Sequence, residues 1–510
     1  MKRALISVAD KTGVGEFAAA LAHLGYEIVA SGGTALYLKE QGVAVTEVSQ
    51  VTNYPEMMDG RVKTLHPAIH GGILMRTDNP SDVASARQAG IQPISIVVVN
   101  LYPFERTVTG EHSLSEAIEN IDIGGPALVR AAAKNYAFVA AVTDPSQYHG
   151  LLCDLREYGE IALSTRQKLA RAAFQHTAYY DSMVAHYLAR TFGPAEFPSR
   201  VGLPLSLVKG LRYGENPHQE GALYAAPGAR VGLPSAVQLQ GKELSYCNIL
   251  DADAAWALVS EFSRPAAVVV KHATPCGVAT APSLLLAYQR AADCDPISTF
   301  GGIVALNREV DVATASAMRE IFLEVIVAPK FSDAAREILS AKRNLRLLTI
   351  SDEGARGDAG HWEVKSIQGG YLVQTSDTWG DKSLWQVVTS VEPTSEERQD
   401  LEFAFVVAKH VKSNAIVIAK QGATLGIGTG QTNRIDAARQ ALERAGERAE
   451  GAVLASEAFF PQPDVLLACV QAGIVAVIHP GGSINDDLSL AAANAAGIAM
   501  LYSKERHFKH

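Results

Sequence analysis

The chain contains few cysteines and no long hydrophobic run. Only 5 of its 510 residues are cysteine, and no two of them form a Cys-x-x-Cys pair. That spacing excludes a disulfide framework and a zinc knuckle, and it fits a reducing compartment. No apolar run has membrane-spanning length, and the apolar stretch near the N-terminus ends at Asp10 without a cleavage site after it. We therefore expect a cytoplasmic protein with no membrane partner.

Positive charge is scarce relative to negative charge. The chain has 45 Lys and Arg against 54 Asp and Glu, which gives a net charge of -9 at pH 7. This balance argues against a broad nucleic-acid surface and leaves room for local basic pockets that bind small anions. Low-complexity tracts are absent and hydrophobic residues make up 48% of the chain, as in ordinary globular proteins. We expect small-molecule substrates and no nucleic-acid partner.

The length predicts more than one folding unit, roughly three or four at ~150 residues each. Residues 1–148 alternate short apolar runs with helical patterns, which predicts an α/β domain with a parallel sheet covered on both faces. The expected strands are 4–8, 27–30, 94–100 and 138–143, and the expected helices are 13–24 and 34–41. A helical connector is expected over 149–200, with one helix from about 164 to 190, and a larger region over 201–510.

The larger region contains two segments with a common plan. Residues 268–270 lead into Lys271 and His272, and residues 415–419 lead towards Gly426-Ile-Gly-Thr-Gly-Gln. Two similar halves, about 201–365 and 366–510, would explain this plan, although residue identity does not demonstrate a repeat.

The first of these segments is the most informative in the chain. Its apolar, β-branched run stops abruptly at Lys271 and His272, and a turn follows. In open α/β sheets ligands bind beyond the carboxyl ends of strands, which favours chemistry at this position. The Lys271 ammonium disfavours the imidazolium, so His272 is expected to be a neutral base near pH 7. The alternative is a strand end whose charged side chains only reach water, and the dipeptide alone favours that alternative.

Residues 59–72 predict an anion site in the first domain. Arg61 and Lys63 stand two apart beside glycines that allow a ligand to approach the backbone. His66 and His70 have the i, i+4 spacing of metal ligands, but Pro67 disrupts a helix there and no Glu lies between them. We do not expect a metal at this position.

Other polar residues of the first domain follow expected strands or open expected helices. Ser31-Gly-Gly-Thr is typical of a phosphate cradle, and Tyr102 follows the strand that ends at Asn100. Asp122 opens a helix whose free N–H groups attract anions, with Lys134 farther along the same helix. Each residue has a structural alternative, such as a buried tyrosine with one hydrogen bond. Together they supply groups for phosphate binding, oxyanion stabilisation and proton transfer.

Longer motifs carry a family resemblance over nearly the whole chain. The first region contains Ser-Val-Ala-Asp-Lys-Thr-Gly, Ser-Gly-Gly-Thr, Gly-Arg-Val-Lys-Thr-Leu-His-Pro, Asn-Leu-Tyr-Pro-Phe and Ile-Asp-Ile-Gly-Gly-Pro. The second contains Leu-Arg-Tyr-Gly-Glu-Asn-Pro-His-Gln, Val-Lys-His, Phe-Gly-Gly, Ser-Asn, Gly-Thr-Gly-Gln, Ala-Phe-Phe-Pro and Arg-His-Phe-Lys-His. These motifs resemble the bifunctional purine biosynthesis family, which joins an IMP cyclohydrolase domain to an AICAR transformylase region.

The resemblance implies a fold and a pair of reactions. The first domain would have a methylglyoxal-synthase-like parallel sheet, and the second region would hold two cytidine-deaminase-like α/β subdomains in a homodimer. The reactions would be formyl transfer from the cosubstrate 10-formyltetrahydrofolate to the amino group of AICAR, giving FAICAR, and dehydrative closure of FAICAR to IMP. One alternative keeps the transformylase but makes the N-terminal domain a silent nucleotide sensor; a weaker one is RNA binding.

The deaminase resemblance also bears on metal content. Zinc deaminases need His-x-Glu and Pro-Cys-x-x-Cys, whereas this chain has only Pro275-Cys276-Gly, and His218-Gln-Glu lies inside a nucleotide-binding motif. We therefore expect acyl transfer without a catalytic metal, with Cys276 in packing.

The resemblance finally implies residue roles. The catalytic residues would be Lys271, His272 and Asn414 for formyl transfer, and Lys63, Tyr102, Asp122 and Lys134 for ring closure. The substrate-binding residues would be Ser7, Lys11, Ser31, Gly33, Thr34, Arg61, Thr64, Asn100, Gly124, Arg212, Tyr213, Phe300, Glu324, Arg434, Phe459 and Arg506. The chain departs from the common family pattern at Thr274, Glu457 and Gln462, where the family often has Asn, Asp and Phe.

Overall fold

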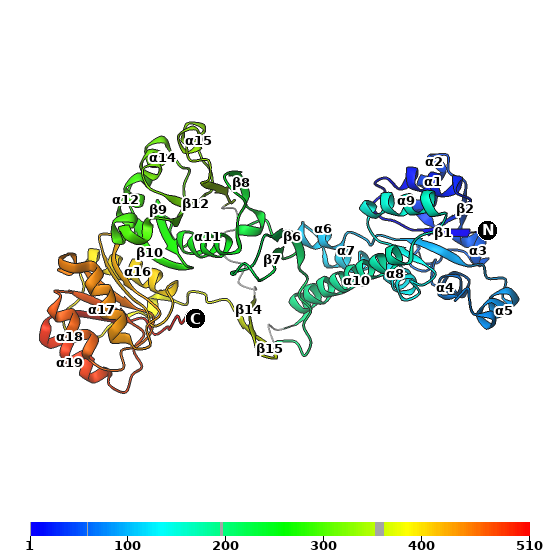
Figure 1. Ribbon diagram of the computed structural model, residues 1–510. Helices are drawn as coiled ribbons and strands as arrows, with labels where there is room; N and C mark the ends of the chain where they lie inside the picture. The colour runs from blue at the N-terminus through cyan, green and yellow to red at the C-terminus, as the bar shows by residue number, and fades with distance from the viewer. Residues whose placement is uncertain (1, 59, 194–196, 352–361) are drawn as a thin grey trace. The chain divides into compact units, whose positions relative to one another are not determined.

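The protein is described from a computed structural model that covers residues 2–58, 60–193, 197–351 and 362–510 (Figure 1). Contacts divide the chain into two compact units. The first comprises Met1–Ser206 with Ala226–Gly228, and the second comprises Leu207–Ala225 with Ala229–His510. Among the described helices, none combines the length and the apolar character needed to cross a bilayer.

The first unit is built on a parallel five-stranded sheet of order β3-β2-β1-β4-β5. Its strands are β1 (Lys2–Ile6), β2 (Tyr26–Ala30), β3 (Val45–Glu47), β4 (Ile94–Val98) and β5 (Ala140–Val142). The central strands are almost entirely apolar because helices cover both faces of a parallel sheet. The predicted parallel sheet is confirmed, and β3 is an additional short strand that the sequence patterns missed.

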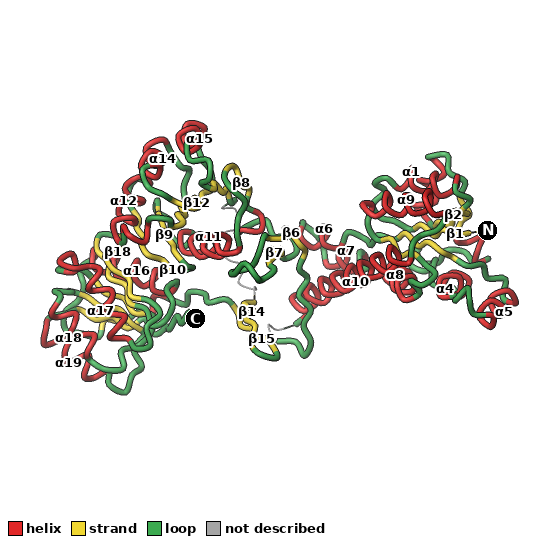
Figure 2. Tube along the Cα trace, viewed as in Figure 1, coloured by secondary structure: helices red, strands yellow, loops and turns green. Residues whose placement is uncertain are grey.

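The first unit contains helices between and after these strands. They are α1 (Val14–His23), α2 (Gly32–Glu40), α3 (Val48–Thr52), α4 (Pro67–Leu74), α5 (Pro80–Gln88), α6 (Phe104–Thr109), α7 (Leu114–Glu119), α8 (Gly124–Lys134), α9 (Tyr148–Tyr158) and α10 (Leu163–Phe192). One core joins α1, α2 and α9 to one face, and a second core joins α3, α4, α8 and α10 to the other (Figure 2). The segment expected as a connector therefore packs as part of the first unit.

The second unit contains a 12-stranded sheet of order β16-β21-β20-β19-β17-β18-β10-β9-β11-β12-β13-β8. Its strands are β8 (Val237–Gln240), β9 (Ala266–Lys271), β10 (Thr274–Thr280), β11 (Gly302–Leu306), β12 (Leu323–Ala328), β13 (Arg346–Thr349), β16 (Gln386–Val387), β17 (Ile416–Lys420), β18 (Ala423–Gly428), β19 (Val453–Ser456), β20 (Ala476–His479) and β21 (Ala499–Tyr502). Two pairs, β6 (Ser206–Leu211) with β7 (Gly221–Ala225) and β14 (Trp362–Ile367) with β15 (Gly370–Thr375), form separate small sheets.

Two halves with the same topology meet at the centre of the large sheet. From the centre outward, one half runs β10, β9, β11, β12, β13, β8 and the other runs β18, β17, β19, β20, β21, β16. The two segments that share a plan in the sequence are the central hairpins, β9–β10 and β17–β18. Strands β10 and β18 pair antiparallel, and the Thr424 hydroxyl is bonded to both the N–H and the C=O of Val278 across this junction.

Helices of the second unit also cover both faces of its sheet. They are α11 (Tyr246–Val259), α12 (Leu284–Cys294), α13 (Pro296–Thr299), α14 (Val312–Arg319), α15 (Asp333–Ser340), α16 (Ser395–Lys409), α17 (Arg434–Ala445), α18 (Asp464–Gln471) and α19 (Asp486–Ala496). Helices α11 and α16 share one core that crosses both halves. Helices α12, α14 and α15 cover the opposite face of the first half, and α17, α18 and α19 cover that of the second.

Lys271 ends strand β9, as the sequence pattern predicts, but the strands around it are not parallel. Strand β9 runs antiparallel to both of its neighbours, β10 and β11. His272 and Ala273 are the two central residues of a tight hairpin turn, with φ angles of 55° and 54°. A two-residue turn of this kind joins antiparallel strands, whereas a parallel pair needs a longer crossover.

Candidate active sites

The first candidate site is a cavity of about 640 Å³ at the carboxyl ends of β1, β2 and β4. It is lined by all of the residues predicted for the first domain except Lys134. These are Ser7, Lys11, Ser31, Gly33, Thr34, Arg61, Lys63, Thr64, Asn100, Tyr102, Asp122 and Gly124. Parallel strands bring their carboxyl ends to one edge, which is why residues distant in sequence meet here.

One wall of this cavity is the N-terminus of α2. The Ser31 hydroxyl precedes the helix and is buried without a hydrogen-bond partner in the described part of the chain. Thr34 Oγ1 bonds the N–H and C=O of Val8 at 3.1 Å each, which ties the helix to the loop after β1. A helix N-terminus with a free hydroxyl is suited to bind a phosphate group.

Two ammonium groups reach the same wall. Lys11 Nζ lies 3.4 Å from Thr34 Oγ1, and Lys63 Nζ lies 3.3 Å from the position that a Cβ on Gly32 would take. Burial lowers the pKa of Lys11; Asp10 opposes this shift and the charge of Lys63 adds to it. An anion placed between these two groups would be stabilised by both charges.

Asp122 lines the same cavity just before the start of α8. Its Oδ1 accepts a hydrogen bond of 2.8 Å from the N–H of Gly125, and its own N–H donates to Tyr180 Oη at 2.8 Å. Burial raises the pKa of the Asp122 carboxyl, against the backbone N–H groups of Gly125 and Tyr102 and the charge of Lys63, which lower it. Gly125 is required here, because a Cβ would lie 2.4 Å from Asp122 Oδ2.

The rim of the cavity carries Asn100, Tyr102 and Arg61. Asn100 Oδ1 accepts from the N–H groups of Ala9 at 2.6 Å and Asp10 at 2.9 Å, which fixes the loop after β1. Tyr102 is 43% exposed, so the predicted buried alternative for this tyrosine is wrong. Arg61 forms an exposed ion pair with Glu119.

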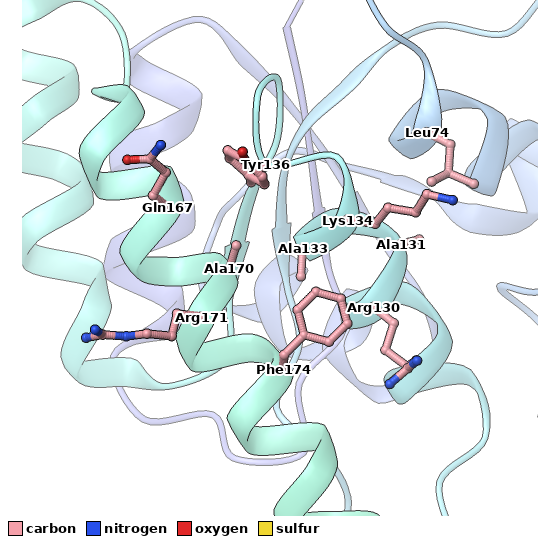
Figure 3. A pocket seen from close by; sticks show the side chains of 10 residues that line it. All are labelled: Leu74, Arg130, Ala131, Ala133, Lys134, Tyr136, Gln167, Ala170, Arg171 and Phe174. Atoms are coloured by element: carbon pink, nitrogen blue, oxygen red, sulfur yellow. The ribbon is translucent and has the colours of Figure 1, made fainter.

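Lys134 lies outside this cavity. It ends α8, whereas Asp122 stands just before the helix begins, and an 11-residue helix is about 16 Å long. Lys134 instead lines a groove of about 640 Å³ between α8 and α10 (Figure 3). Ala131, Ala133 and Ala170 line the groove together with Phe174. A single chain therefore does not bring Lys134 to the residues it was predicted to assist.

The second candidate site is a smaller cavity of about 230 Å³ beside the β9–β10 turn. Lys271, His272 and Thr274 come from the first half of the second unit, and Thr429 and Gln440 come from the second half. His272 is exposed, and Lys271 Nζ donates to the carbonyl of Phe300 at 2.9 Å. The site thus lies where the two halves meet.

Cys276, which lines this cavity, is not suited to act as a nucleophile. Burial raises the pKa of the Cys276 thiol to about 12, and the nearby Asp295 and Cys294 add to the shift. A thiol of that pKa holds almost no thiolate near neutral pH, so it is a poor nucleophile. No three His, Cys, Asp or Glu side chains among the described residues are grouped to hold a metal ion.

Asn414 lies in a network that ends at the same cavity. Its Nδ2 donates to the carbonyl of Gln431 at 2.8 Å, and its Oδ1 accepts from Arg434 Nη2 at 2.7 Å. The Gln431 amide lies 3.3 Å from Gln440 Oε1, and Gln440 lines the cavity. Two hydrogen-bonded glutamines therefore separate Asn414 from the wall beside His272.

Arg434 is enclosed by acceptors of its own chain. Its Nη1 donates to Glu457 Oε2 at 2.6 Å and to Ser456 Oγ at 2.7 Å, and Nη2 lies 3.2 Å from Glu457 Oε1. Arg434 and Glu457 are both buried. Nη1 and Nη2 are therefore bonded within the protein, whereas Nε is buried with no hydrogen-bond partner in the described chain.

The remaining predicted residues of the second region do not line the cavity beside His272 in the described chain. Arg212 Nη2 donates to Tyr213 Oη at 2.9 Å after β6, and Glu324 pairs with Arg346 at 2.6 Å. Phe300 packs against Phe322 with a 5.4 Å centroid separation, Arg506 lies 4.4 Å over the ring of Phe508, and Phe459 is half-buried after β19.

The comparisons with known proteins agree with each other. A family model described as AICARFT/IMPCHase bienzyme matches residues 132–444, and one described as MGS-like domain matches residues 13–127. The bifunctional purine biosynthesis protein PurH of Bacillus cereus (strain B4264) is 51% identical, with 100% of both chains covered. The chain belongs to the AICARFT/IMPCHase bienzyme family. Proteins of the same name from Thermoanaerobacter sp. (strain X514) and Anoxybacillus flavithermus (strain DSM 21510 / WK1) are 51% and 52% identical over the same share of both chains.

Membership in the AICARFT/IMPCHase bienzyme family fixes the overall activity. The chain is a bifunctional enzyme of purine biosynthesis, with AICAR formyltransferase and IMP cyclohydrolase activities acting on small-molecule substrates. The predicted function is thus confirmed over the alternative of a silent sensor domain. The MGS-like match lies within the first unit and confirms the predicted methylglyoxal-synthase-like sheet.

Several lining residues of this bienzyme were missed by sequence reasoning. Gln440 and Arg444 stand one turn apart on α17, but no pattern indicated that α17 would reach the turn at His272. Asp295 had a recognisable signal, because Asp followed by Pro is typical of a helix start, and its Oδ1 caps α13 at Ser298. Gly125 had the signal of a second glycine directly after Gly124.

Proposed function

We propose that the cavity of the first unit closes FAICAR to IMP, and that the cavity beside His272 transfers the formyl group from 10-formyltetrahydrofolate to AICAR. The strongest support is that the predicted residues of the first domain, Lys134 excepted, line one cavity of about 640 Å³. This volume is in the range of ligand pockets for nucleotide-sized molecules.

Ring closure begins with the phosphate of FAICAR bound at the N-terminus of α2. Ser31 Oγ and the backbone N–H groups of the helix donate to it, and Lys11 balances its charge. The carboxamide nitrogen is then held against the formyl carbon, so the reaction is intramolecular and positioning supplies much of the acceleration.

Proton transfer completes the closure. Asp122 accepts the proton that the carboxamide nitrogen loses as the new C–N bond forms, a role that suits a carboxyl with a raised pKa. Lys63 and Tyr102 stabilise the formyl oxygen as it gains negative charge and then protonate it, so that it leaves as water. The formamide nitrogen loses its proton as the hydroxyl departs, and the resulting C=N bond makes the purine ring aromatic.

Formyl transfer requires help for a weakly nucleophilic amine. The 5-amino nitrogen of AICAR attacks the formyl carbon, and His272 takes the proton that the nitrogen loses. Lys271 stabilises negative charge on the formyl oxygen and assists protonation of the departing folate nitrogen. Removal of FAICAR by the second reaction then draws this transfer forward.

Asn414 acts on the cavity beside His272 indirectly in this scheme, through Gln431 and Gln440. An amide can turn either its oxygen or its NH2 group towards a ligand, but the Arg434 guanidinium has no acceptor and must face the oxygen. Asn414 Oδ1 accepts from Arg434 at 2.7 Å, which leaves one N–H of Nδ2 beyond the bond to Gln431. We assign Arg434 a role in orienting Asn414.

The functional form in this proposal is a cytoplasmic homodimer that uses no catalytic metal and binds neither membrane nor nucleic acid. The dimer is supported by residues that one chain leaves away from the cavities, Lys134 in the first unit and Arg212, Phe459 and Arg506 in the second. Zinc chemistry is disfavoured because the Pro275-Cys276-Gly segment lacks the second cysteine of zinc deaminases.

The assignment of the two cavities is tested by separating the activities. Lys63→Ala in the full-length protein should abolish the absorbance change of FAICAR cyclisation and leave formyl transfer to AICAR intact. Retained cyclisation in this variant would show that ring closure takes place elsewhere and that the first cavity only binds nucleotide.

A further inference from the structure

The two central hairpins of the second unit are held by the same device. In the first, Asp251 of α11 accepts the N–H of His272 at 3.3 Å and the N–H of Ala273 at 2.6 Å. In the second, Asp400 of α16 accepts the N–H of Gln421 and the N–H of Gly422, each at 2.7 Å. Each half therefore closes its hairpin turn with one helix carboxylate.

Other contacts match between the two hairpins. Lys271 Nζ donates to the carbonyl of Phe300 at 2.9 Å, and Lys420 Nζ donates to the carbonyl of Glu450 at 2.8 Å. Each hairpin also carries a glycine four residues after the last residue of its turn, where a Cβ would lie 1.9 Å or 2.0 Å from a helix carbonyl; these are Gly277 and Gly426. Both hairpins thus have a lysine bonded to a backbone carbonyl, including the hairpin that carries no proposed catalytic residue.

The copies differ at the two central turn positions. His272 stands where the second copy has Gln421, and Ala273 stands where it has Gly422. All four residues have φ between 54° and 69°, the left-handed region. Glycine adopts this region freely, whereas alanine and histidine do so only when the surroundings hold them there.

Asp251 is the group that holds them. Its two carboxylate oxygens accept from two consecutive N–H groups, and hydrogen bonds to a charged acceptor are the stronger kind. Without this carboxylate the turn would relax, because Ala273 has no intrinsic preference for positive φ. His272 would then be displaced from the cavity that it lines with Lys271 and Gln440.

We propose that Asp251 is a positioning residue for formyl transfer, which fixes the turn so that the His272 imidazole meets the AICAR amine. This inference rests on the proposed role of His272 as the base. The second hairpin provides a matched control, because Asp400 performs the same structural task for a turn that carries no imidazole.

The test compares Asp251→Asn with Asp400→Asn in the full-length protein. An asparagine keeps one acceptor but turns an NH2 group towards the second N–H, so each substitution disrupts its turn in the same way. We expect Asp251→Asn to lower kcat for AICAR formylation roughly ten- to a hundred-fold with little change in KM, as for a reacting group displaced by about 1 Å. Asp400→Asn should keep kcat within about threefold, and both variants should cyclise FAICAR normally.

A rescue experiment separates positioning from general damage. Adding Ala273→Gly to Asp251→Asn should restore much of the lost kcat, because glycine adopts the turn conformation without the carboxylate. If Asp251→Asn does not fold, the pair Asp251→Ser and Asp400→Ser carries the same comparison. Equal losses of kcat in the two members of a pair, or no loss in either, would overturn the proposal.

Replacing His272 separates two proposals, that His272 is the base and that Asp251 positions it. If His272→Ala keeps full formylation, the proposed base is wrong and the role of Asp251 is overturned with it. If His272→Ala abolishes formylation while Asp251→Asn keeps full kcat, only the positioning role is wrong.

Discussion

Arg434 Nη2 donates a hydrogen bond of 2.7 Å to Asn414 Oδ1, and the same guanidinium donates two hydrogen bonds to the buried carboxylate of Glu457. The bond fixes which end of the Asn414 amide faces Arg434. Because Arg434 and Glu457 are both buried, this orientation is set by the fold before any substrate arrives. A chain of three side chains thus links a core carboxylate to a residue predicted to act in formyl transfer.

This link predicts an effect of Glu457 on catalysis. Glu457→Gln replaces one acceptor of Arg434 by an NH2 group that opposes the guanidinium, so Arg434 and the Asn414 amide should lose their fixed orientation. We expect kcat for formyl transfer to fall about tenfold, measured with AICAR and 10-formyltetrahydrofolate, while FAICAR cyclisation stays normal. Glu457→Asp keeps the carboxylate and should retain most of the activity; equal kcat losses in both variants would contradict the orienting role.

The hairpin at His272 predicts a clean separation of the two activities. Lys271→Ala or His272→Ala should lower formyl transfer at least a hundredfold, since each removes a group proposed to stabilise charge or move a proton. Ring closure should be unchanged, because its cavity lies in the other unit. The matched controls are Lys420→Ala and Gln421→Ala in the second hairpin, which should spare both activities. Loss of both activities in a folded His272→Ala protein would refute the assignment.

Replacing Asp122 should lower the rate of FAICAR cyclisation and raise the thermal stability of the protein. Asp122→Asn removes the proposed base, so FAICAR cyclisation should fall about a hundredfold or more. Because burial raises the pKa of this carboxyl, the folded protein favours its protonated form. The stabilisation from the protonated form is fully present below the unfolded pKa, and it is lost as pH rises through the folded pKa.

The measurement for Asp122 is thermal unfolding as a function of pH. At pH 7 the Asn variant should melt at a higher temperature than the wild type, because it buries no carboxylate. The difference should vanish below about pH 3.9, the ordinary pKa of an aspartic acid, where the wild-type carboxyl is protonated in both states. A variant that melts lower than the wild type at pH 7 would show that the charge of Asp122 stabilises the fold.

Ser31 offers a test of the phosphate cradle. Its hydroxyl is buried without a partner in the described chain, so the free protein bears a desolvation cost that a phosphate oxygen would remove. Ser31→Ala should weaken binding of IMP, which carries the same phosphate, about fivefold, corresponding to about 1 kcal/mol, while leaving the melting temperature equal or slightly higher. The dissociation constant can be measured by calorimetry with IMP. Unchanged affinity would place the phosphate elsewhere.

Much of the first site could be predicted from sequence because its geometry follows from strand ends. Ser7, Ser31 and Asn100 each follow an apolar run, and a parallel sheet must bring such positions together. The position of Lys134 could not be predicted in this way, because it lies at the end of a helix and not of a strand. Helix α8 separates it from Asp122 along the helix axis, and only the three-dimensional path reveals that the two residues face different cavities.

The second site was harder to predict for a physical reason. The turn at His272 and Ala273 lacks the Asn-Gly type of signal that marks a two-residue hairpin, so the sequence indicated where the strand ends but not that the chain turns back there. The N–H groups of this turn are held instead by Asp251, 21 residues before His272. Such tertiary control leaves no local trace in the sequence.

The pairing of β10 with β18 has a consequence for the integrity of the second unit. If the chain were cut between its halves, each fragment would present a bare edge strand with unsatisfied N–H and C=O groups and an open apolar seam. We expect each such fragment to dimerise with itself through that edge or to aggregate. Joining the two halves in one polypeptide protects the seam and permits the halves to diverge, one retaining an imidazole at its hairpin tip and the other an amide.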